Sequence, residues 1–399
     1  MSIPTAPSVP IPPEWRTRNL LELVSIATGQ VDPREPRYRD LTLVAPDHVE
    51  PETGRLLARV SARAQGAVSG KYRVRPGDVV YSKIRPYLKK AVLCDFEGLC
   101  SADMYPLTPK PGVSGSFVLH TLLSEPFTSF ATSVSARSGI PKINRTELAE
   151  YRVLTPGPQE QAAIAATLDD TDRLVAALER AVAKRQAVKH GMLQQLLSGM
   201  VRLSGFDGPW AERPLGEIAR ITMGQSPPSA SYNTSRRGLP LLQGNADIKA
   251  RRSIERLWTT APAKTCARGD VLLTVRAPVG LASMASRDAC LGRGVCALDS
   301  YGSNDYLFHA LVLAEPRWAA YEQGSTFTAI NSEEIRNFPI TLPDDVAEQA
   351  AIAGALDDVD ANIRTLRERL AKAKAIKQGM MQELLTGRTQ LPVGRLEAA

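Results

Sequence analysis

A chain of 399 residues is longer than most single domains and suits two or three of them. Its composition, 43% hydrophobic and 23% charged, is that of a globular protein, and the sequence has no apolar run long enough to cross a membrane. The net charge of +7 is mildly basic, so it permits binding to nucleic acid without indicating it by itself. The N-terminus also lacks the basic-then-apolar pattern of a secretory signal, and we expect a cytoplasmic protein.

In chain order, the sequence predicts two mixed domains, each followed by a long helix. The predicted segments are an extended, proline-rich arm at 1–13, a first domain at 14–157, a helix at 158–200, a second domain at 208–345, a helix at 346–387 and a C-terminal tail at 388–399. Short β-rich runs, turns and short helices alternate within both domains. This mixture predicts the α+β class.

Both domains contain similar short phrases. A glycine turn precedes a β-rich run in each, "GDVVYSKI" in the first domain and "GDVLLTV" in the second. Further along, "NRTELAEYRV" and "NSEEIRNFPI" predict a capped helical turn that leads into a strand. Thr146 with Glu147 in the first phrase, and Ser332 with Glu334 in the second, predict the N-terminal cap region.

The segments 158–200 and 346–387 have apolar residues at steps of mostly three, four or seven, which is the helix period. The residues expected to pack along this stripe are Ile164, Leu168, Val175, Leu178, Val182, Ile352, Leu356, Ile363, Leu366 and Leu370. Gly199 and Gly387 follow the last apolar residues and predict helix stops. Gly191 and Gly379 fall inside the pattern, where they suggest a kink or a close helix approach.

The two predicted helices are copies of one another. "KHGMLQQLLSG" at 189–199 returns as "KQGMMQELLTG" at 377–387, and "EQAAIAATLDDTD" returns as "EQAAIAGALDDVD". The domains share their ends, but their central portions align poorly. The chain is therefore a tandem duplication, which suggests one scaffold with two different specificities. The twin helices are expected to pair antiparallel, and the alternative is that each packs only on its own domain.

Catalytic motifs are missing from the sequence. There is no GxxxxGK[ST], GxSxG or HExxH. Asp247-Ile248-Lys249 has the letters of a nuclease DxK motif but no paired upstream acid in a convincing strand context. The five cysteines contain no CxxC, so buried free thiols are expected and no metal site is predicted. The sequence therefore indicates a binding protein without a catalytic site.

The duplicated phrases resemble the specificity (S) subunit of Type I restriction–modification systems. The motifs that carry the resemblance are the two "EQ-x-A-I-A-x-x-L-D-x-x-D" starts, the two "K-x-G-M-x-Q-x-L-L-[ST]-G" ends and the "INRTEL" and "INSEEI" lead-ins, over nearly the whole chain. The resemblance implies two target recognition domains, separated by two long helices in an antiparallel coiled coil. Each domain would then read one half of a split, asymmetric site in double-stranded DNA.

The resemblance also implies partners and a division of labour. The family's S subunit is not an enzyme; it binds two modification subunits that methylate adenine, and the complex can recruit two motor-nuclease subunits. No cofactor is expected in this chain, because S-adenosylmethionine, ATP and Mg²⁺ would belong to the partner subunits. An autonomous methyltransferase or nuclease, and a coiled-coil scaffold without a DNA role, are the alternative functions.

Candidate DNA contacts follow from residue type, since Lys and Arg meet phosphates while Arg, Asn, Ser and Thr also reach base edges. Residues 55–90 are rich in Lys and Arg and contain one acid, Asp78, with tyrosines interleaved. The first-domain candidates are Arg63, Lys71, Arg73, Lys83, Arg85, Tyr87, Lys89, Arg137 and Lys142. The second-domain candidates are Arg236, Arg237, Asn245, Lys249, Arg251, Arg252, Arg276, Arg293, Ser325 and Thr326. For any one of these, the alternative is a solvated surface residue, and Arg85 and Arg276 lie in equivalent turns where they can be structural.

Overall fold

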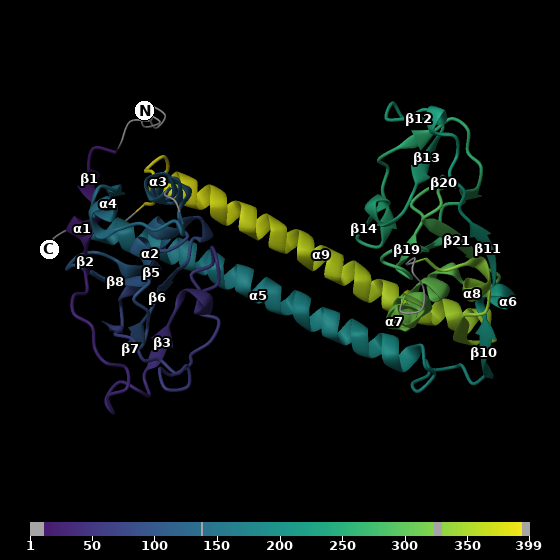
Figure 1. The fold of residues 1–399 in the computed structure, drawn as a ribbon, viewed down its shortest axis with the longest axis horizontal. Coiled ribbons are helices and arrows are strands. Elements are labelled where there is room, and N and C mark those ends of the chain that lie inside the picture. Colours follow the sequence, from purple (N-terminus) through teal and green to yellow (C-terminus); the bar gives the residue numbers. More distant parts are fainter. Residues whose placement is uncertain (1–11, 137–138, 323–328, 393–399) are drawn as a thin grey trace. The chain divides into compact units, whose positions relative to one another are not determined.

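The computed structural model describes residues 12–136, 139–322 and 329–392. The chain divides into two compact units: unit 1 contains residues 1–179 and 368–399, and unit 2 contains residues 180–367. Each unit combines small sheets with helices, and the two long helices α5 (Pro158–Leu196) and α9 (Val346–Leu384) stand out in Figure 1. The predicted α+β class is confirmed. No helix in the described part of the chain has the length and apolarity that crossing a membrane requires.

Unit 1 is built on a four-stranded antiparallel sheet in the order β2-β8-β5-β6 and a three-stranded sheet in the order β3-β7-β4. Helix α2 packs on β5 and β6, and α3 follows it directly. The strands are β1 (Arg16–Asn19), β2 (Val24–Ile26), β3 (Thr42–Val44), β4 (Tyr72–Val74), β5 (Val79–Ser82), β6 (Ala91–Leu93), β7 (Gly98–Cys100), β8 (Met104–Pro109) and β9 (Arg152–Thr155). The helices are α1 (Leu20–Leu23), α2 (Gly115–Leu123), α3 (Glu125–Ser135) and α4 (Arg145–Ala149).

Unit 2 has a six-stranded sheet in the order β11-β21-β18-β19-β15-β14 and a five-stranded sheet in the order β12-β16-β13-β20-β17. Its strands are β10 (Trp210–Pro214), β11 (Ala219–Met223), β12 (Tyr232–Asn233), β13 (Leu239–Leu242), β14 (Ile248–Lys249), β15 (Arg252–Ser253), β16 (Trp258–Thr259), β17 (Thr265–Cys266), β18 (Val271–Thr274), β19 (Ala282–Met284), β20 (Ala289–Leu291), β21 (Val295–Ser300) and β22 (Pro339–Pro343). The helices are α6 (Leu215–Ile218), α7 (Asn304–Glu322) and α8 (Ser332–Arg336). The extra strands of unit 2 lie where the two halves of the sequence align poorly.

The duplicated "GD" phrases form the same turn in both units. Gly77 and Gly269 both have φ of +92°, a left-handed conformation that glycine adopts without strain. The next residue is a buried aspartate in each case. The Asp78 carboxylate accepts a hydrogen bond from the backbone N–H of Arg75, and Asp270 accepts one from Ala267. The turn delivers the chain into the buried strands β5 and β18.

The N-caps of the short helices α4 and α8 are Asn144 and Asn331 instead of Thr146 and Ser332, while the predicted Glu147 and Glu334 take part in the caps. The Asn144 side chain accepts a hydrogen bond from Glu147 N, and the Asn331 side chain accepts from Glu334 N. Each glutamate returns a hydrogen bond to the asparagine N–H, which completes a capping box. Thr146 and Ser332 lie inside the helices, so the expectation was displaced by one or two residues.

The two long helices pack together within each unit. In unit 2, Lys189 Nζ on α5 lies 2.6 Å from Asp360 Oδ2 on α9, and in unit 1 Lys377 Nζ lies 2.5 Å from Asp172 Oδ1. Both pairs join the late part of one helix to the early part of the other, so the helices run antiparallel in both units. The alternative in which each helix packs only on its own domain is therefore wrong.

Both helices also contribute to the domain cores. Ile164 and Leu168 lie in the core of unit 1, and Ile352 and Leu356 lie in the core of unit 2. The remaining predicted stripe residues are buried at Val175, Leu178, Val182 and Ile363 and half-buried at Leu366 and Leu370. Leu193 and Leu196 in the late part of α5, and Leu197 just after it, pack in the core of unit 2, while Leu384 of α9 packs in the core of unit 1. The stripe is thus shared between helix pairing and domain cores.

The glycines of the long helices have two distinct roles. Gly199 and Gly387 adopt φ of +71° and +72° just after the helices end, as expected of stops. Gly191 and Gly379 lie inside uninterrupted helix, and a Cβ at either position would meet nothing within 4 Å. The suggested close helix approach at these glycines is therefore wrong, and the suggested kink stays a prediction.

A buried histidine connects each domain to its long helix. The Nε2 atom of His120 on α2 lies 2.8 Å from Asp169 Oδ1 on α5. The Nε2 atom of His309 on α7 lies 3.0 Å from Asp357 Oδ1 on α9. Both histidines are fully buried. Partial burial alone would raise the pKa of the Asp169 carboxyl, but hydrogen bonds from His120 and Ser116 outweigh it and hold that pKa below its usual value. The duplication therefore preserved one docking contact in both units.

We expect Asp169→Ala to lower the free energy of unfolding by about 1–3 kcal/mol, because it leaves the buried His120 Nε2 and the Ser116 hydroxyl without their acceptor. The matched control is Asp170→Ala, which removes only an exposed ion pair with Arg173 and should change stability by less than about 0.5 kcal/mol. Since the folded-state pKa of Asp169 is lowered, its contribution is complete above the unfolded-state pKa and is lost as the pH falls through the folded value. Denaturant unfolding at several pH values measures both effects; equal losses for the two variants would contradict a docking role.

All five cysteines are free and buried, as predicted. Burial raises the pKa of the Cys94 thiol to about 12, so this group stays protonated and unreactive at neutral pH.

Candidate nucleic-acid interface

The turn after β5 in unit 1 gathers several positive charges. The Arg85 N–H donates to the Pro141 carbonyl at 2.8 Å, and the Ile143 N–H donates to the Lys83 carbonyl at 2.9 Å. These bonds hold Lys83, Arg85 and Lys142 on neighbouring strand-like segments, with Arg145 at the start of α4 close by. We call Lys83, Arg85, Lys142 and Arg145 the basic turn.

The electrostatics of the basic turn suit an anion. Desolvation lowers the pKa of Lys83, and the positive charges of Lys142 and Arg145 lower it further against the attraction of Asp103. The Lys83 ammonium and the Arg145 guanidinium lie 5.5 Å and 5.8 Å from the centroid of the Tyr105 ring. Like charges held this close without an ion-pair partner among the described residues would be relieved by a phosphate.

The backbone around the basic turn is held in an unusual conformation. Arg85 and Lys89, on either side of a short 3₁₀ turn, both have φ of +49°. Non-glycine residues seldom adopt this left-handed region, and such residues gather at functional sites. Tyr87, between them, is 50% exposed, so its ring is available to a ligand. The predicted candidates Lys83, Arg85, Tyr87, Lys89 and Lys142 therefore come together on one part of unit 1.

The other first-domain candidates lie apart from the basic turn or are engaged. Arg63 pairs with Asp40 and Arg73 with Glu97, each at 2.8 Å and largely exposed, so these ion pairs are weak and can exchange for phosphates. Lys89, beside the basic turn, pairs with Glu125 at 2.8 Å, and its side chain is only 19% exposed, so this ion pair is less free to exchange. Lys71 is buried, and its ammonium donates to the Ser69 carbonyl and hydroxyl, so it is a structural residue. Arg137 lies outside the described residues.

Unit 2 has the same turn with different side chains. The Ile330 N–H donates to the Val275 carbonyl at 3.0 Å, as Ile143 does to Lys83, and Arg276 pairs with Ala329 in an isolated bridge. Arg276 is exposed, whereas Val275 takes the place of Lys83. Ser325 and Thr326, predicted in the adjoining loop, lie outside the described residues.

The remaining candidates of unit 2 divide into exposed and structural residues. The exposed ones are Arg236, Arg237, Asn245, Lys249, Arg252 and Arg293. Arg293 Nε donates to Ser226 Oγ at 3.1 Å. Arg251 is half-buried with φ of +64°, and its guanidinium binds both carboxylate oxygens of Glu315 on α7 and donates to the Ala282 carbonyl. Arg251 therefore ties the β14–β15 turn to the domain core, and we remove it from the candidate interface.

The acidic clusters have structural partners. The Asp247 carboxylate is buried and accepts a hydrogen bond from the backbone N–H of Gln243 at 2.7 Å. The aspartate of the DxK sequence therefore has a structural role. His309, Asp357 and Asp360 bring three ligand-type atoms within 4.8 Å of one another, but the Lys189 ammonium binds Asp360. A lysine in that position supplies the positive charge that a metal ion would bring.

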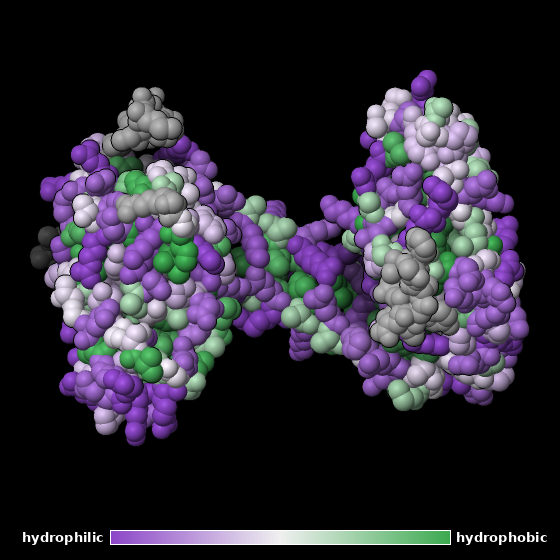
Figure 2. All heavy atoms as spheres, in the orientation of Figure 1, coloured by the Kyte–Doolittle hydropathy of each residue, from purple (hydrophilic) through white to green (hydrophobic). Residues whose placement is uncertain are grey.

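Sequence reasoning missed three arginines that the fold places beside candidate residues. Arg145 joins the basic turn, while Arg268 and Arg287 lie near Arg236 in unit 2. Arg145 lies two residues after Ile143 in the "INRTEL" motif and three after the candidate Lys142. This closeness in the sequence could have identified Arg145 as a candidate. Arg268 and Arg287 come from separate turns, and no local pattern connects them. Figure 2 shows hydrophilic residues over most of the visible face of each unit, with small separated apolar patches.

The domain arrangement matches a known family model. The model for the Type I restriction modification DNA specificity domain matches residues 12–189 and again residues 208–375. The chain belongs to the family of Type I DNA specificity subunits. As an S subunit it has two target recognition domains and is itself non-catalytic, so the predicted family and function are confirmed.

Relatives of this S subunit are found in distant organisms. The chain is 29% identical over 342 residues to a protein named as the MjaX specificity subunit of a type I restriction enzyme from Methanocaldococcus jannaschii, covering 80% of each chain. It is 31% identical over 192 residues to the type I restriction enzyme EcoDI specificity subunit from Escherichia coli, covering 48% of this chain and 42% of that one.

Solved structures resemble the S subunit over nearly its whole length. A chain from a structure of complex assembly and conformational transition in the type I R-M system is 29% identical, with a TM-score of 0.62 and coverage of 96% and 100%. The HsdS subunit from Thermoanaerobacter tengcongensis is 28% identical, with a TM-score of 0.51 and coverage of 96% and 99%. An S subunit from M. genitalium, 13% identical with a TM-score of 0.66 and coverage of 96% and 99%, shares the fold.

Proposed function

We propose that each recognition domain reads one half of a bipartite, asymmetric DNA site and that the paired helices set the distance between the halves. The observation that carries this proposal is that equivalent turns in the two domains have the same backbone hydrogen bonds but different side chains. The turns after β5 and β18 have equivalent backbone hydrogen bonds, yet the first carries half-buried Lys83 and exposed Arg85, whereas the second carries buried Val275 at the place of Lys83 and exposed Arg276. Equivalent frames with unlike side chains suit two unlike half-sites, and linking two weak modules raises the effective affinity.

We further infer that two modification subunits dock on the long helices. An exposed surface of α5, formed by Lys184 and Val188, is repeated on α9 by Lys372 and Ile376. Val188 and Ile376 are 39% and 49% exposed, so each copy of this surface offers an apolar side chain beside a lysine for a partner to cover. A surface that occurs twice fits two copies of one partner.

The chemistry of the complex then resides in those partners. The modification subunits supply the S-adenosylmethionine site for adenine methylation, and motor-nuclease subunits, where they join, bring the requirement for ATP and Mg²⁺. The assembled complex is expected to act on double-stranded DNA in the cytoplasm. Support for an assembly comes from the 29% identical chain whose structure concerns complex assembly of the type I R-M system.

Deleting the gene for this chain is expected to abolish methylation at one bipartite adenine motif across the host genome, because the modification subunits lose their DNA reader. Single-molecule methylome sequencing of the host, the deletion strain and the complemented strain measures this. Complementation should restore the same motif and no other. A deletion strain that kept every methylated motif would contradict the proposal.

A further inference from the structure

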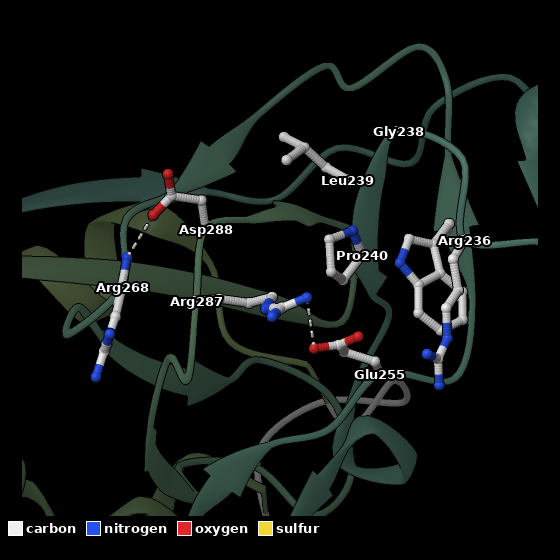
Figure 3. A pocket seen from close by; sticks show the side chains of 9 residues that line it. Arg236, Gly238, Leu239, Pro240, Glu255, Arg268, Arg287 and Asp288 are labelled. Carbon is white, nitrogen blue, oxygen red and sulfur yellow. Dashed lines mark hydrogen bonds and ion pairs between the residues drawn. The ribbon is translucent and has the colours of Figure 1, made fainter.

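Unit 2 contains a pocket of about 460 Å³ that no catalytic or docking role accounts for. Four separate parts of the chain converge on it: the loop after β12, strands β13 and β16 with the segment before β16, the turn after β17 and the β19–β20 turn. The lining residues are Arg236, Gly238, Leu239, Pro240, Glu255, Trp258, Arg268, Arg287 and Asp288. In the view of Figure 3, Arg268 and Arg236 lie on opposite sides of Arg287, and the Glu255 carboxylate lies beside the Arg287 guanidinium. The pocket is thus assembled by tertiary structure around three guanidinium groups.

Local contacts position Arg236 in the pocket. Arg236 has φ of +58°, and its guanidinium carbon lies 5.6 Å from the centroid of the Trp258 ring, within cation–π range. The Asn233 side chain closes the loop by donating to the Arg237 carbonyl and accepting from the Arg237 N–H, both at 3.0 Å. Neither Arg236 nor Arg268 has an acidic ion-pair partner among the residues that the structure describes.

The two acids of the pocket leave an excess of positive charge. The Asp288 carboxylate accepts the backbone N–H of Arg268 at 2.8 Å, so it holds the turn that carries Arg268. The Glu255 carboxylate binds the Arg287 guanidinium at 2.9 Å, with side chains 32% and 59% exposed (Figure 3). A pair this exposed is weak and exchangeable. Glu255 therefore acts as a resident counterion that an incoming anion can replace on Arg287.

The chemistry of the lining favours a phosphate over a nucleobase. Guanidinium groups donate hydrogen bonds and accept none, and their planar fork matches a phosphate. A guanidinium can also pair with a guanine edge, but the lining contains no Asn, Gln, Ser or Thr side chain, and its two carboxylates are already engaged by Arg287 and by the Arg268 N–H. Trp258 is 6% exposed and lies under Arg236, so its ring cannot serve as a stacking platform for a base.

We propose that this pocket binds a backbone phosphodiester of the bound duplex, next to the half-site read by the second recognition domain. This inference rests on the proposed function, since it assigns Arg236, Arg268 and Arg287 to one subsite of the same DNA interface. The contact positions the domain on the duplex without contributing sequence preference. Glu255 lowers the affinity of the subsite by occupying Arg287 when DNA is absent.

The test uses the complex of this chain with its modification subunits and a labelled duplex that contains the methylated motif. Binding is measured from about 50 to 300 mM salt, with a duplex whose second half-site is scrambled as the comparison. We expect Arg268→Gln/Arg287→Gln to weaken binding about 10-fold or more on both duplexes and to reduce the salt slope by about 1 to 2. The methylated motif should stay unchanged. Glu255→Gln should instead tighten binding by several-fold.

The matched control is Arg213→Gln/Arg220→Gln, which removes the same net charge from two exposed arginines of unit 2, paired with Asp344 and Asp299. Equal weakening by the control would overturn the pocket assignment, because it would reflect net charge alone. An unchanged salt slope, or a loss confined to the motif duplex, would also overturn it. Thermal unfolding of each variant complex verifies that the fold is intact.

Two further outcomes separate the pocket from its alternatives. If the complex without substitutions fails to bind the motif duplex, that result contradicts the proposed function itself and not only the pocket assignment. If inorganic phosphate or a nucleotide binds saturably to the DNA-free complex and Arg287→Gln abolishes that binding, the pocket serves a free phosphate ligand and the DNA assignment is overturned.

Discussion

Replacing residues 208–345 with the corresponding domain of another Type I S subunit is expected to change one half of the methylated motif and leave the other half unchanged. The physical reason is that the two units have separate hydrophobic cores. The core of unit 2 includes Leu196, Ile352 and Leu356 from the long helices, so the donor domain must fit these side chains. A donor with histidine at the position of His309 preserves the contact to Asp357.

Methylome sequencing of the exchanged protein gives the result directly. The reciprocal replacement of residues 14–157 is the matched control and should change only the other half of the motif. A donor chosen without the histidine should still change the motif but give a less stable protein. If either single exchange altered both halves, the two domains would not be independent readers.

Lengthening both helices by one turn is expected to increase the spacing within the motif without changing either half. The Lys189–Asp360 pair sets the local register, so the residue that faces Lys184 on α9 lies near Thr365. Four residues inserted after Lys184 and four after Thr365 add about 6 Å, roughly two base steps at 3.4 Å each. The pairs Lys189–Asp360 and Lys377–Asp172 remain aligned because both helices grow together.

Substituting residues 184–187 with four other helix-forming residues, without insertion, is the control and should keep the original spacing. Insertion in α5 alone moves Lys189 out of register with Asp360 and should prevent stable assembly. Methylome sequencing reports the spacing, and size-exclusion chromatography reports the assembly. A motif with unchanged spacing after the double insertion would contradict the role of the helices in setting distance.

Much of the fold was available from local sequence patterns. A 3.6-residue apolar period extends over about ten turns in α5 and α9, so it predicts long helices whatever lies around them. The duplicated "GD" phrases predict their turns because a positive φ and an aspartate cap depend on adjacent residues. The misplaced N-caps show where prediction from local patterns fails. Asn, Ser and Thr are all favourable N-cap residues, so only the backbone geometry distinguishes Asn144 from its neighbours.

The sequence by itself determined the duplication, the two antiparallel helices, the class of fold and the family, because periodicity and repeated phrases are properties of neighbouring residues. Only the tertiary structure decided which basic residues are available to DNA. Lys71 and Arg251 look like their neighbours in sequence, yet burial and the distant partner Glu315 make them structural. The same fold brings Arg268 and Arg287, from separate turns, to one pocket with Arg236. The environment of a charge depends on residues far away in the chain, which no local pattern contains.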